Sequence, residues 1–285
     1  MALRVNTNIA SINAQRNLSV STSALNKSLE KISSGLRINR AADDPAGLAV
    51  SEKLRAQIRG YNQAVRNAND AVSLVQTAEG ALSEVNNILV RMKELATQAA
   101  NGTLSQTDRN NLDKEFQALA SEITRISNVT EFNGTNLIDG SISASANAVK
   151  FQIGIDNSAN DRLTLTMNDL DASALKLGAN SGSNGITTIS SIDMAQSALD
   201  VIDSAIDTIT TNRGTLGALQ NRLESTINNL MVSAENASAA QSRIRDVDFA
   251  SETANYVKQQ ILVQAGTSIL AQANVAPQAA LSLLG

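Results

Sequence analysis

The apolar residues between 45 and 101 recur at steps of three and four, and this spacing restricts the fold more than any other feature. The repeat is carried by Leu54, Ile58, Tyr61, Val65, Ala68, Val72, Val75, Leu82, Val85, Leu89, Met92 and Leu95, with Glu79 as the one polar residue in the series. Such spacing predicts a helix that packs lengthwise against other helices. Asp44-Pro45 is typical of an N-cap and a first helical residue, and Asn101-Gly102 ends the pattern. A helix of about 55 residues is about 80 Å long, so we expect elongated packing rather than a compact core.

Four further segments carry helical spacing. The first lies upstream of Gly35. Ser105, followed three residues later by Asp108, predicts a capping box at the start of the next helix. Helical spacing returns after Ser190, and a last stretch ends where Pro277 weakens it. We therefore expect a mainly α fold, in which the chain turns back and its long helices pack antiparallel as a coiled-coil rod.

The middle of the chain, about 130–178, has a different pattern. Asn133-Gly134 is typical of a tight turn. Apolar and polar residues alternate over 149–153 and again over 163–167. This alternation predicts two short strands that form a small β-hairpin region between the long helices.

The composition excludes several classes of enzyme and metalloprotein. The chain has no Cys, no His and no Trp, so it lacks thiolate and histidine metal ligands and an imidazole base. No GxxxxGK[ST] or GxGxxG motif indicates a nucleotide site. Asp246, Asp248 and Glu252 lack the spacing of a calcium loop, and we interpret them as residues of a helix start. The sequence therefore predicts no enzyme and no cofactor.

Charge is distributed unevenly along the chain. The formal net charge is −4, from 23 Lys and Arg against 27 Asp and Glu, and this acidic balance argues against nucleic-acid binding. No charged side chain occurs from Gln259 to Gly285. Glutamines and Pro277 make this segment a poor transmembrane helix, so we predict that the chain does not span a membrane. The first residues contain no long apolar run, which predicts no cleaved signal peptide.

The uncharged ends, 5–15 and 259–285, are expected to be buried by other molecules. We expect them to pair and then to pack against copies of the chain, because a repeated head-to-tail contact that does not close gives a filament. A soluble coiled-coil adaptor is the alternative, but it predicts a charged C-terminal end. The candidate assembly residues are Val5, Ile9, Ile12, Leu18, Leu25, Leu29, Ile32, Ile261, Ala265, Ile269, Leu270 and Ala273.

Six segments resemble bacterial flagellin and stand in the order found in that family. They are SSGLRINRAADDPAGLA (33–49), QTAEGAL (76–82), TEFNG (130–134), QNRLESTINNL (220–230), SRIRDVDFASE (242–252) and ILAQAN followed by PQ (269–278). The resemblance covers 1–140 and 190–285. Because only a short variable segment, about 140–190, remains, the chain resembles a flagellin that lacks large outer domains.

The resemblance implies a structural subunit that polymerises into the extracellular flagellar filament for swimming. It implies an inner-core domain of 1–43 plus 245–285 and an outer-core domain of 44–244, with helices over 44–129 and 190–235. The implied partners are copies of the chain, the type III export apparatus, an export chaperone, the filament cap and the hook-junction proteins. The nearest alternative is the hook–filament junction protein, which is disfavoured because QNRLESTINNL and SRIRDVDFA are both present.

The resemblance also implies recognition of the monomer by Toll-like receptor 5. LVRMKELATQ (89–98) is similar to the receptor-binding segment of the family, of the type LQRVRELAVQ, although four positions depart from it. The family's receptor-contacting arginine and leucine fall on Arg91 and Leu95, and its acidic residue falls on Glu115. Helical spacing alone offers another interpretation, in which Leu95 lies in a helix interface and Arg91 on a solvated face.

Overall fold

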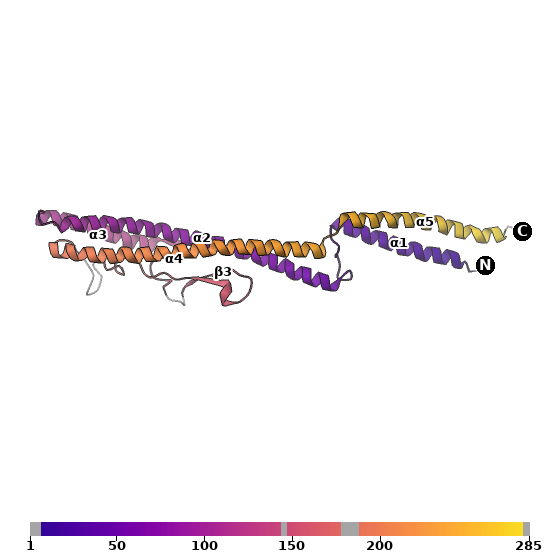
Figure 1. Cartoon of the computed structure of the whole chain (residues 1–285), viewed down its shortest axis with the longest axis horizontal. Coiled ribbons are helices and arrows are strands. Elements are labelled where there is room, and N and C mark those ends of the chain that lie inside the picture. The colour runs from indigo at the N-terminus through magenta and orange to yellow at the C-terminus, as the bar shows by residue number, and fades with distance from the viewer. Residues whose placement is uncertain (1–6, 144–146, 178–187, 282–285) are drawn as a thin grey trace. The chain divides into compact units, whose positions relative to one another are not determined.

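The structure is a computed structural model that describes residues 7–143, 147–177 and 188–281, and side chains up to residue 275 in the last of these ranges. Its long helices are α1 (Ile9–Ser34), α2 (Pro45–Ala99), α3 (Gln106–Val129), α4 (Ile192–Arg245) and α5 (Phe249–Leu281) (Figure 1). The chain forms two compact units, one of residues 1–58 and 235–285 and one of residues 59–234. The predicted mainly α fold with long antiparallel helices and a small β-hairpin region is confirmed.

Two helix ends differ from the sequence expectation. The helix expected over 190–235 continues to Arg245, since no Gly or Pro occurs between 231 and 245 to end it. α5 continues through Pro277 to Leu281, so the last helix extends beyond this proline. Pro277 removes one backbone N–H from the helix but does not end it.

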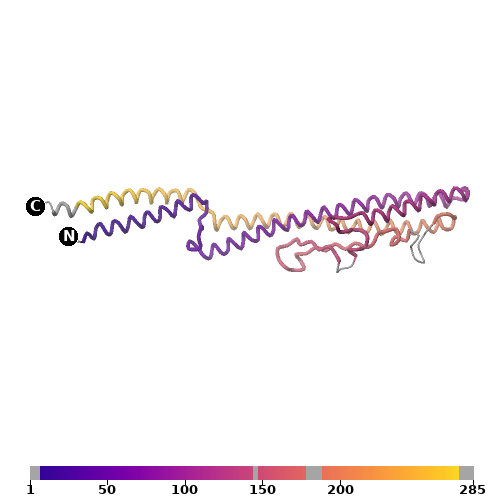
Figure 2. Tube along the Cα trace, turned by 180° about the vertical axis from the view of Figure 1, so that it is seen from behind, coloured from indigo at the N-terminus to yellow at the C-terminus, as the bar shows by residue number. Residues whose placement is uncertain are grey.

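The core of the unit 59–234 is a narrow interface along α2, α3 and α4, which lie side by side in both views (Figures 1 and 2). Buried residues on α2 repeat at steps of four and three: Ala64, Ala68, Ala71, Val75, Ala78, Leu82, Val85, Leu89 and Met92. Lys93 pairs with Asp203, and Arg213 lies 3.7 Å from Glu79. Residue numbers rise along α2 as they fall along α4, so these two helices are antiparallel. Because many interface residues are alanine, the helix axes approach closely.

Two short hairpins cover part of this unit. β1 (Glu131–Phe132) and β2 (Thr135–Asn136) are joined by Asn133 and Gly134, whose φ values are 51° and 76°. Both residues adopt the left-handed conformation that a two-residue hairpin turn requires. β3 (Val149–Gln152) pairs antiparallel with β4 (Arg162–Leu165), which follows a 3-10 turn η1 (Ala159–Asp161). The predicted strands are therefore present.

Arg109 on α3 is a buried cation that closes the α2–α3 turn. Its side chain is 8% exposed, and its guanidinium donates to the carbonyls of Asn101 (3.1 Å) and Leu104 (2.7 Å), with a longer bond to Ala99 (3.5 Å). The last carbonyls of a helix have no donor within the helix, and α2 has no basic residue in its last turn. Arg109 therefore holds the α2–α3 turn mainly through the carbonyls of Asn101 and Leu104, and its longest bond reaches the last residue of α2. The predicted capping box of Ser105 and Asp108 orients the start of α3.

We predict that Arg109→Ala lowers the free energy of unfolding by about 2 kcal/mol, because hydrogen bonds from a charged donor contribute about that much. Urea unfolding followed by far-ultraviolet circular dichroism measures the change. Arg125→Ala is the matched control, because Arg125 lies on the same helix but is exposed and pairs with Glu122. An equal shift of the unfolding midpoint in both variants would contradict the role of Arg109 in stabilising the α2–α3 turn.

Candidate assembly surface

α1 and α5 form an antiparallel pair within the unit of residues 1–58 and 235–285. Asn8 Nδ2 lies 2.7 Å from the carbonyl of Ala273 at one end, and Leu36 forms a β-bridge with Asp246 at the other. Both views show α1 and α5 running side by side (Figures 1 and 2). The residues that face the partner helix, which we call the seam, are at least half-buried and recur every three or four positions: Ser11, Ala14, Leu18, Ser21, Leu25, Ser28 and Ile32 on α1, and Glu252, Tyr256, Gln259, Val263, Gly266, Leu270 and Ala273 on α5.

Small residues let the two helices of the seam approach closely. A Cβ atom built at Gly266 would lie 3.2 Å from Leu18 Cδ1, which is tighter than an ordinary van der Waals contact. The absence of a side chain at Gly266 therefore makes room for Leu18. The expected assembly residues that lie on the seam are Leu18, Leu25, Ile32, Leu270 and Ala273.

A second set of apolar residues points away from the seam into solvent. We call this set the apolar outer surface: Ile9, Ile12, Val20 and Leu29 on α1, and Val257, Ile261, Leu262, Ile269 and Val275 on α5. Their exposed fractions run from 43% for Leu262 to 64% for Val20. Ala265 is also exposed and lies between Ile261 and Ile269 on one row of α5.

The apolar outer surface contains five of the expected assembly residues, namely Ile9, Ile12, Leu29, Ile261 and Ile269. Sequence reasoning did not assign Val20, Val257, Leu262 and Val275 to assembly. For the three on α5, the signal is the lack of a single polar face on that helix, since apolar residues left over from one face must lie on another. Val5 lies outside the described residues.

A helix that is apolar on more than one side is normally buried on more than one side. α1 covers only the seam of α5 and leaves the apolar outer surface in water. From Gln259 onward no charged residue keeps α5 solvated. Within the described ranges, no helix is both long and apolar enough to cross a membrane.

The connector between α1 and α2 ties α1 to the end of α4. The backbone N–H of Arg37 donates to the carbonyl of Arg245 at 2.7 Å, and the Arg37 guanidinium donates to the carbonyl of Ile244 at 2.6 and 3.2 Å. Lys27 Nζ lies 2.7 Å from Asp43 Oδ1, and the backbone N–H groups of Asn39 and Arg40 donate to Asp43 Oδ2. The Lys27 bond, supported by the Arg40 backbone bond, lowers the pKa of Asp43 from 3.8 to about 2.

The residues expected to meet an immune receptor lie on α2 and α3. Arg91 Nη1 lies 2.8 Å from Glu94 Oε2, and Arg91 Nη2 lies 2.9 Å from Glu115 Oε1. The hydrogen bonds that Arg91 donates, first to Glu94 and then to Glu115, raise the pKa of its guanidinium. The side chains of Arg91 and Glu115 are 50% and 45% exposed. Leu95 is 1% exposed and belongs to the core, so only Arg91 and Glu115 of the three present their side chains at the surface.

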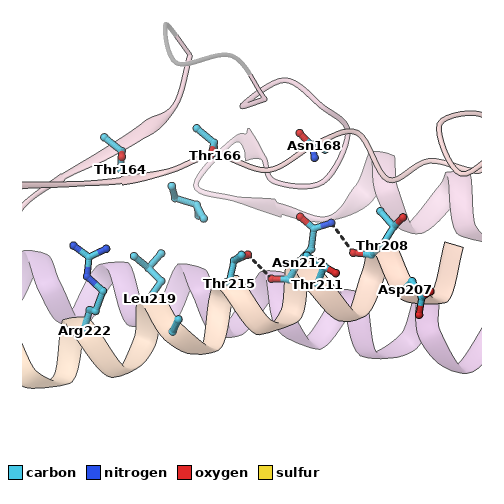
Figure 3. A pocket seen from close by; sticks show the side chains of 12 residues that line it. Thr164, Thr166, Asn168, Asp207, Thr208, Thr211, Asn212, Thr215, Leu219 and Arg222 are labelled. Carbon is cyan, nitrogen blue, oxygen red and sulfur yellow. Dashed lines mark hydrogen bonds between the residues drawn. The ribbon is translucent and has the colours of Figure 1, made fainter. Parts of the chain in front are cut away.

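A polar groove of about 720 Å³ lies between α4 and the segment that runs on from β4 (Figure 3). Arg222 and Asp207 stand at opposite ends of the view, with Thr164, Thr166 and Asn168 across from α4. Polar side chains of α4 within the groove bond their own helix: Asn212 Nδ2 donates to the carbonyl of Thr208 at 2.9 Å, and Thr215 Oγ1 donates to the carbonyl of Asn212 at 2.7 Å. These groups are thus satisfied within the helix.

Comparison with known families decides the identity of these helices. A model of the bacterial flagellin N-terminal helical region matches residues 5–143, and a model of the C-terminal helical region matches residues 199–284. The chain belongs to the bacterial flagellin family. Both family regions are helical, as are α1 to α3 and α4 to α5. The resemblance seen in the sequence motifs is confirmed.

Whole-chain relatives agree with this assignment. The chain is 48% identical over 280 residues to a flagellin of Halalkalibacterium halodurans, covering 98% of this chain and 99% of that protein. It is 46% identical over 305 residues to a flagellin of Bacillus subtilis (strain 168), covering 99% and 100%. A putative flagellar hook-associated protein from Vibrio parahaemolyticus shares the fold alone, at 13% identity and a TM-score of 0.57, covering 72% and 100%.

This flagellin is therefore a structural subunit of the bacterial flagellar filament, which is built by self-assembly and lies outside the cell. The alternative of a hook–filament junction protein receives no support from the family models or from the whole-chain relatives. The family is a structural one, in accordance with the expectation that the chain is no enzyme.

Proposed function

We propose that neighbouring subunits bury the apolar outer surface in the interior of the filament. The observation that carries this proposal is that α5 is apolar on the seam and on the outer side, with no charge after Lys258. The inner-core domain would then comprise 1–43 plus 245–285, and the outer-core domain 44–244. Of the expected assembly residues, those on the seam hold the helix pair together, and those on the outer side meet other subunits.

The free energy gained by removing apolar side chains from water favours burial of the apolar outer surface. Full burial of a large aliphatic side chain contributes about 1.5–3 kcal/mol, so each half-exposed one still has about 1 kcal/mol to gain. Nine such residues amount to the order of 10 kcal/mol per subunit, before the cost of ordering the chain is subtracted. A single unpaired charge placed in such an interface would cost several kcal/mol. An uncharged segment is therefore what this burial requires.

We also propose a route to the filament and a set of partners. The subunit leaves the cell through the flagellar type III export apparatus. Its further partners are an export chaperone, the filament cap and the hook-junction proteins, and it binds no nucleic acid. Membership of the flagellin family and the acidic net charge of −4 support this proposal.

We predict that Ile261→Asp abolishes filament growth, because the carboxylate would be desolvated among apolar neighbours without a partner. Purified subunits are added to filament seeds, and growth is followed by electron microscopy and sedimentation. The matched control is Thr253→Asp, which adds the same charge at an exposed position of α5 that lies outside the apolar outer surface. Normal filament growth by Ile261→Asp subunits would contradict the proposed burial.

A second proposal is recognition of the free subunit by Toll-like receptor 5 through Arg91 and Glu115. These two side chains present opposite charges at the surface, where α2 and α3 meet. Leu95 contributes by packing beneath them, because its side chain is buried in the unit. The similarity of residues 89–98 to the receptor-binding segment of the family supports this proposal.

We predict that Arg91→Ala lowers receptor signalling by about tenfold, since arginine is among the residue types enriched at interface positions whose truncation costs more than about 1 kcal/mol. Unassembled subunits are titrated on reporter cells that carry the receptor. Arg125→Ala serves as the control, because Arg125 is an exposed arginine on α3 with one carboxylate partner. Unchanged signalling by Arg91→Ala would remove this proposal and leave the assembly proposal intact.

A further inference from the structure

Apolar packing does not fix the register of α1 against α5. Large residues of the seam recur after seven positions, namely Leu18, Leu25 and Ile32 on α1, and Tyr256, Val263 and Leu270 on α5. Sliding one helix by seven residues, about 10 Å, keeps these two rows of large residues in the same phase. Lys31 Nζ lies 3.8 Å from Glu252 Oε2, which is a long contact between two side chains that are 22% and 13% exposed.

One backbone carbonyl of α5 differs from its neighbours. In a helix, the N–H of residue 277 would bond the carbonyl of residue 273, but proline has no N–H. Pro277 therefore leaves the Ala273 carbonyl without its donor inside the helix. Asn8 Nδ2 donates to this carbonyl at 2.7 Å.

The Asn8 side chain serves both helices at once. Its Oδ1 accepts the backbone N–H of Ser11 at 3.1 Å and so caps the start of α1. Its Nδ2 meets α5, and Ser11 Oγ donates to Asn274 Oδ1 at 2.8 Å beside it. Asn8, the N-cap residue of α1, is thus hydrogen-bonded to one specific position of α5, the carbonyl of Ala273.

We infer that Asn8 is a positioning residue that sets the register of α1 against α5 by binding the carbonyl that Pro277 leaves free. A slide by seven residues in either direction breaks this bond. A slide toward the start of α5 places Asn8 at residue 266, whose carbonyl is already bonded by the N–H of residue 270. A polar contact at one position of an apolar helix interface is an established way to fix register.

The register decides which parts of the apolar outer surface lie side by side. In the observed register, Ile9 and Ile12 lie near the end of α5 that holds Ile269 and Val275, because Asn8 contacts Ala273. A slide by seven residues would shift Ile9 and Ile12 by about 10 Å relative to Ile269 and Val275. The inference does not depend on burial of the surface in the filament, because the register can be measured within one chain.

The test uses pairs of engineered cysteines in the full chain, which has no cysteine of its own. A Cβ atom at Gly266 would lie 3.8 Å from Leu18 Cβ, within the range of about 3.5–4.5 Å for a disulfide. Leu18→Cys with Gly266→Cys therefore reports the observed register. Leu18→Cys with Gln259→Cys reports the register slid by seven residues toward the start of α5, in which Asn8 lies at residue 266. Closure rates in dilute oxidant are measured by mass spectrometry of the unassembled chain.

With Asn8 intact, we expect the first pair to close about tenfold faster than the second, because the second cannot reach disulfide distance in the observed register. Asn8→Asp keeps an oxygen to cap α1 but removes the donor to Ala273. It should lower the ratio of the two rates about fivefold, which corresponds to one typical hydrogen bond. Opening of the helix pair affects both cysteine pairs alike, so the ratio reports register rather than stability.

Two controls separate this role from others. Asn17→Asp makes the same change at an exposed position of α1 and should leave the ratio unchanged. Arg37→Ala removes the side-chain bonds of the connector to Ile244. The inference is overturned if Asn8→Asp leaves the ratio unchanged, if only Arg37→Ala lowers it, or if both cysteine pairs close equally fast with Asn8 intact.

Discussion

α1 and α5 are apolar on more than one side, but their contact with each other covers one side of each helix. Assembly of the subunit depends on the apolar surface that this contact leaves exposed. The seam is filled by small residues such as Ser21, Ser28 and Gly266, which allow close approach but bury little area. Isolated helices gain most of their stability from an apolar face packed against a partner. α1 and α5 therefore have a partner for one face, and the filament supplies the partner for the other.

The unit of residues 59–234 shows what a complete interface looks like in the same chain. Along α2, buried residues recur without interruption from Ala64 to Met92, and α3 and α4 supply the facing side chains. Arg109 closes the α2–α3 turn, and ion pairs such as Lys93 with Asp203 link α2 and α4 at the rim. This unit satisfies its own apolar surface, so it can present charged groups such as Arg91 and Glu115 to solvent.

Sequence spacing predicted the helices well, because each obeys a local rule. The 55-residue helix from Pro45, the capping box at Ser105 and the paired strands around Phe151 and Leu163 all depend on periodicity or on neighbouring residues. The spacing did not predict which side of α5 meets α1. A helix that is apolar on several sides has no single periodic face, so Ile261 and Ile269 could not be told apart from Val263 and Leu270.

Hydrogen exchange of backbone amides tests most directly whether the filament completes the α1–α5 pair. The same chain is compared as free subunit and as filament, with α2 residues 75–92 as the internal reference. We predict fast exchange in α1 and α5 of the free subunit, strong protection of both helices in the filament, and little change in residues 75–92 of α2. Equal protection of α1 and α5 in the two states would contradict it.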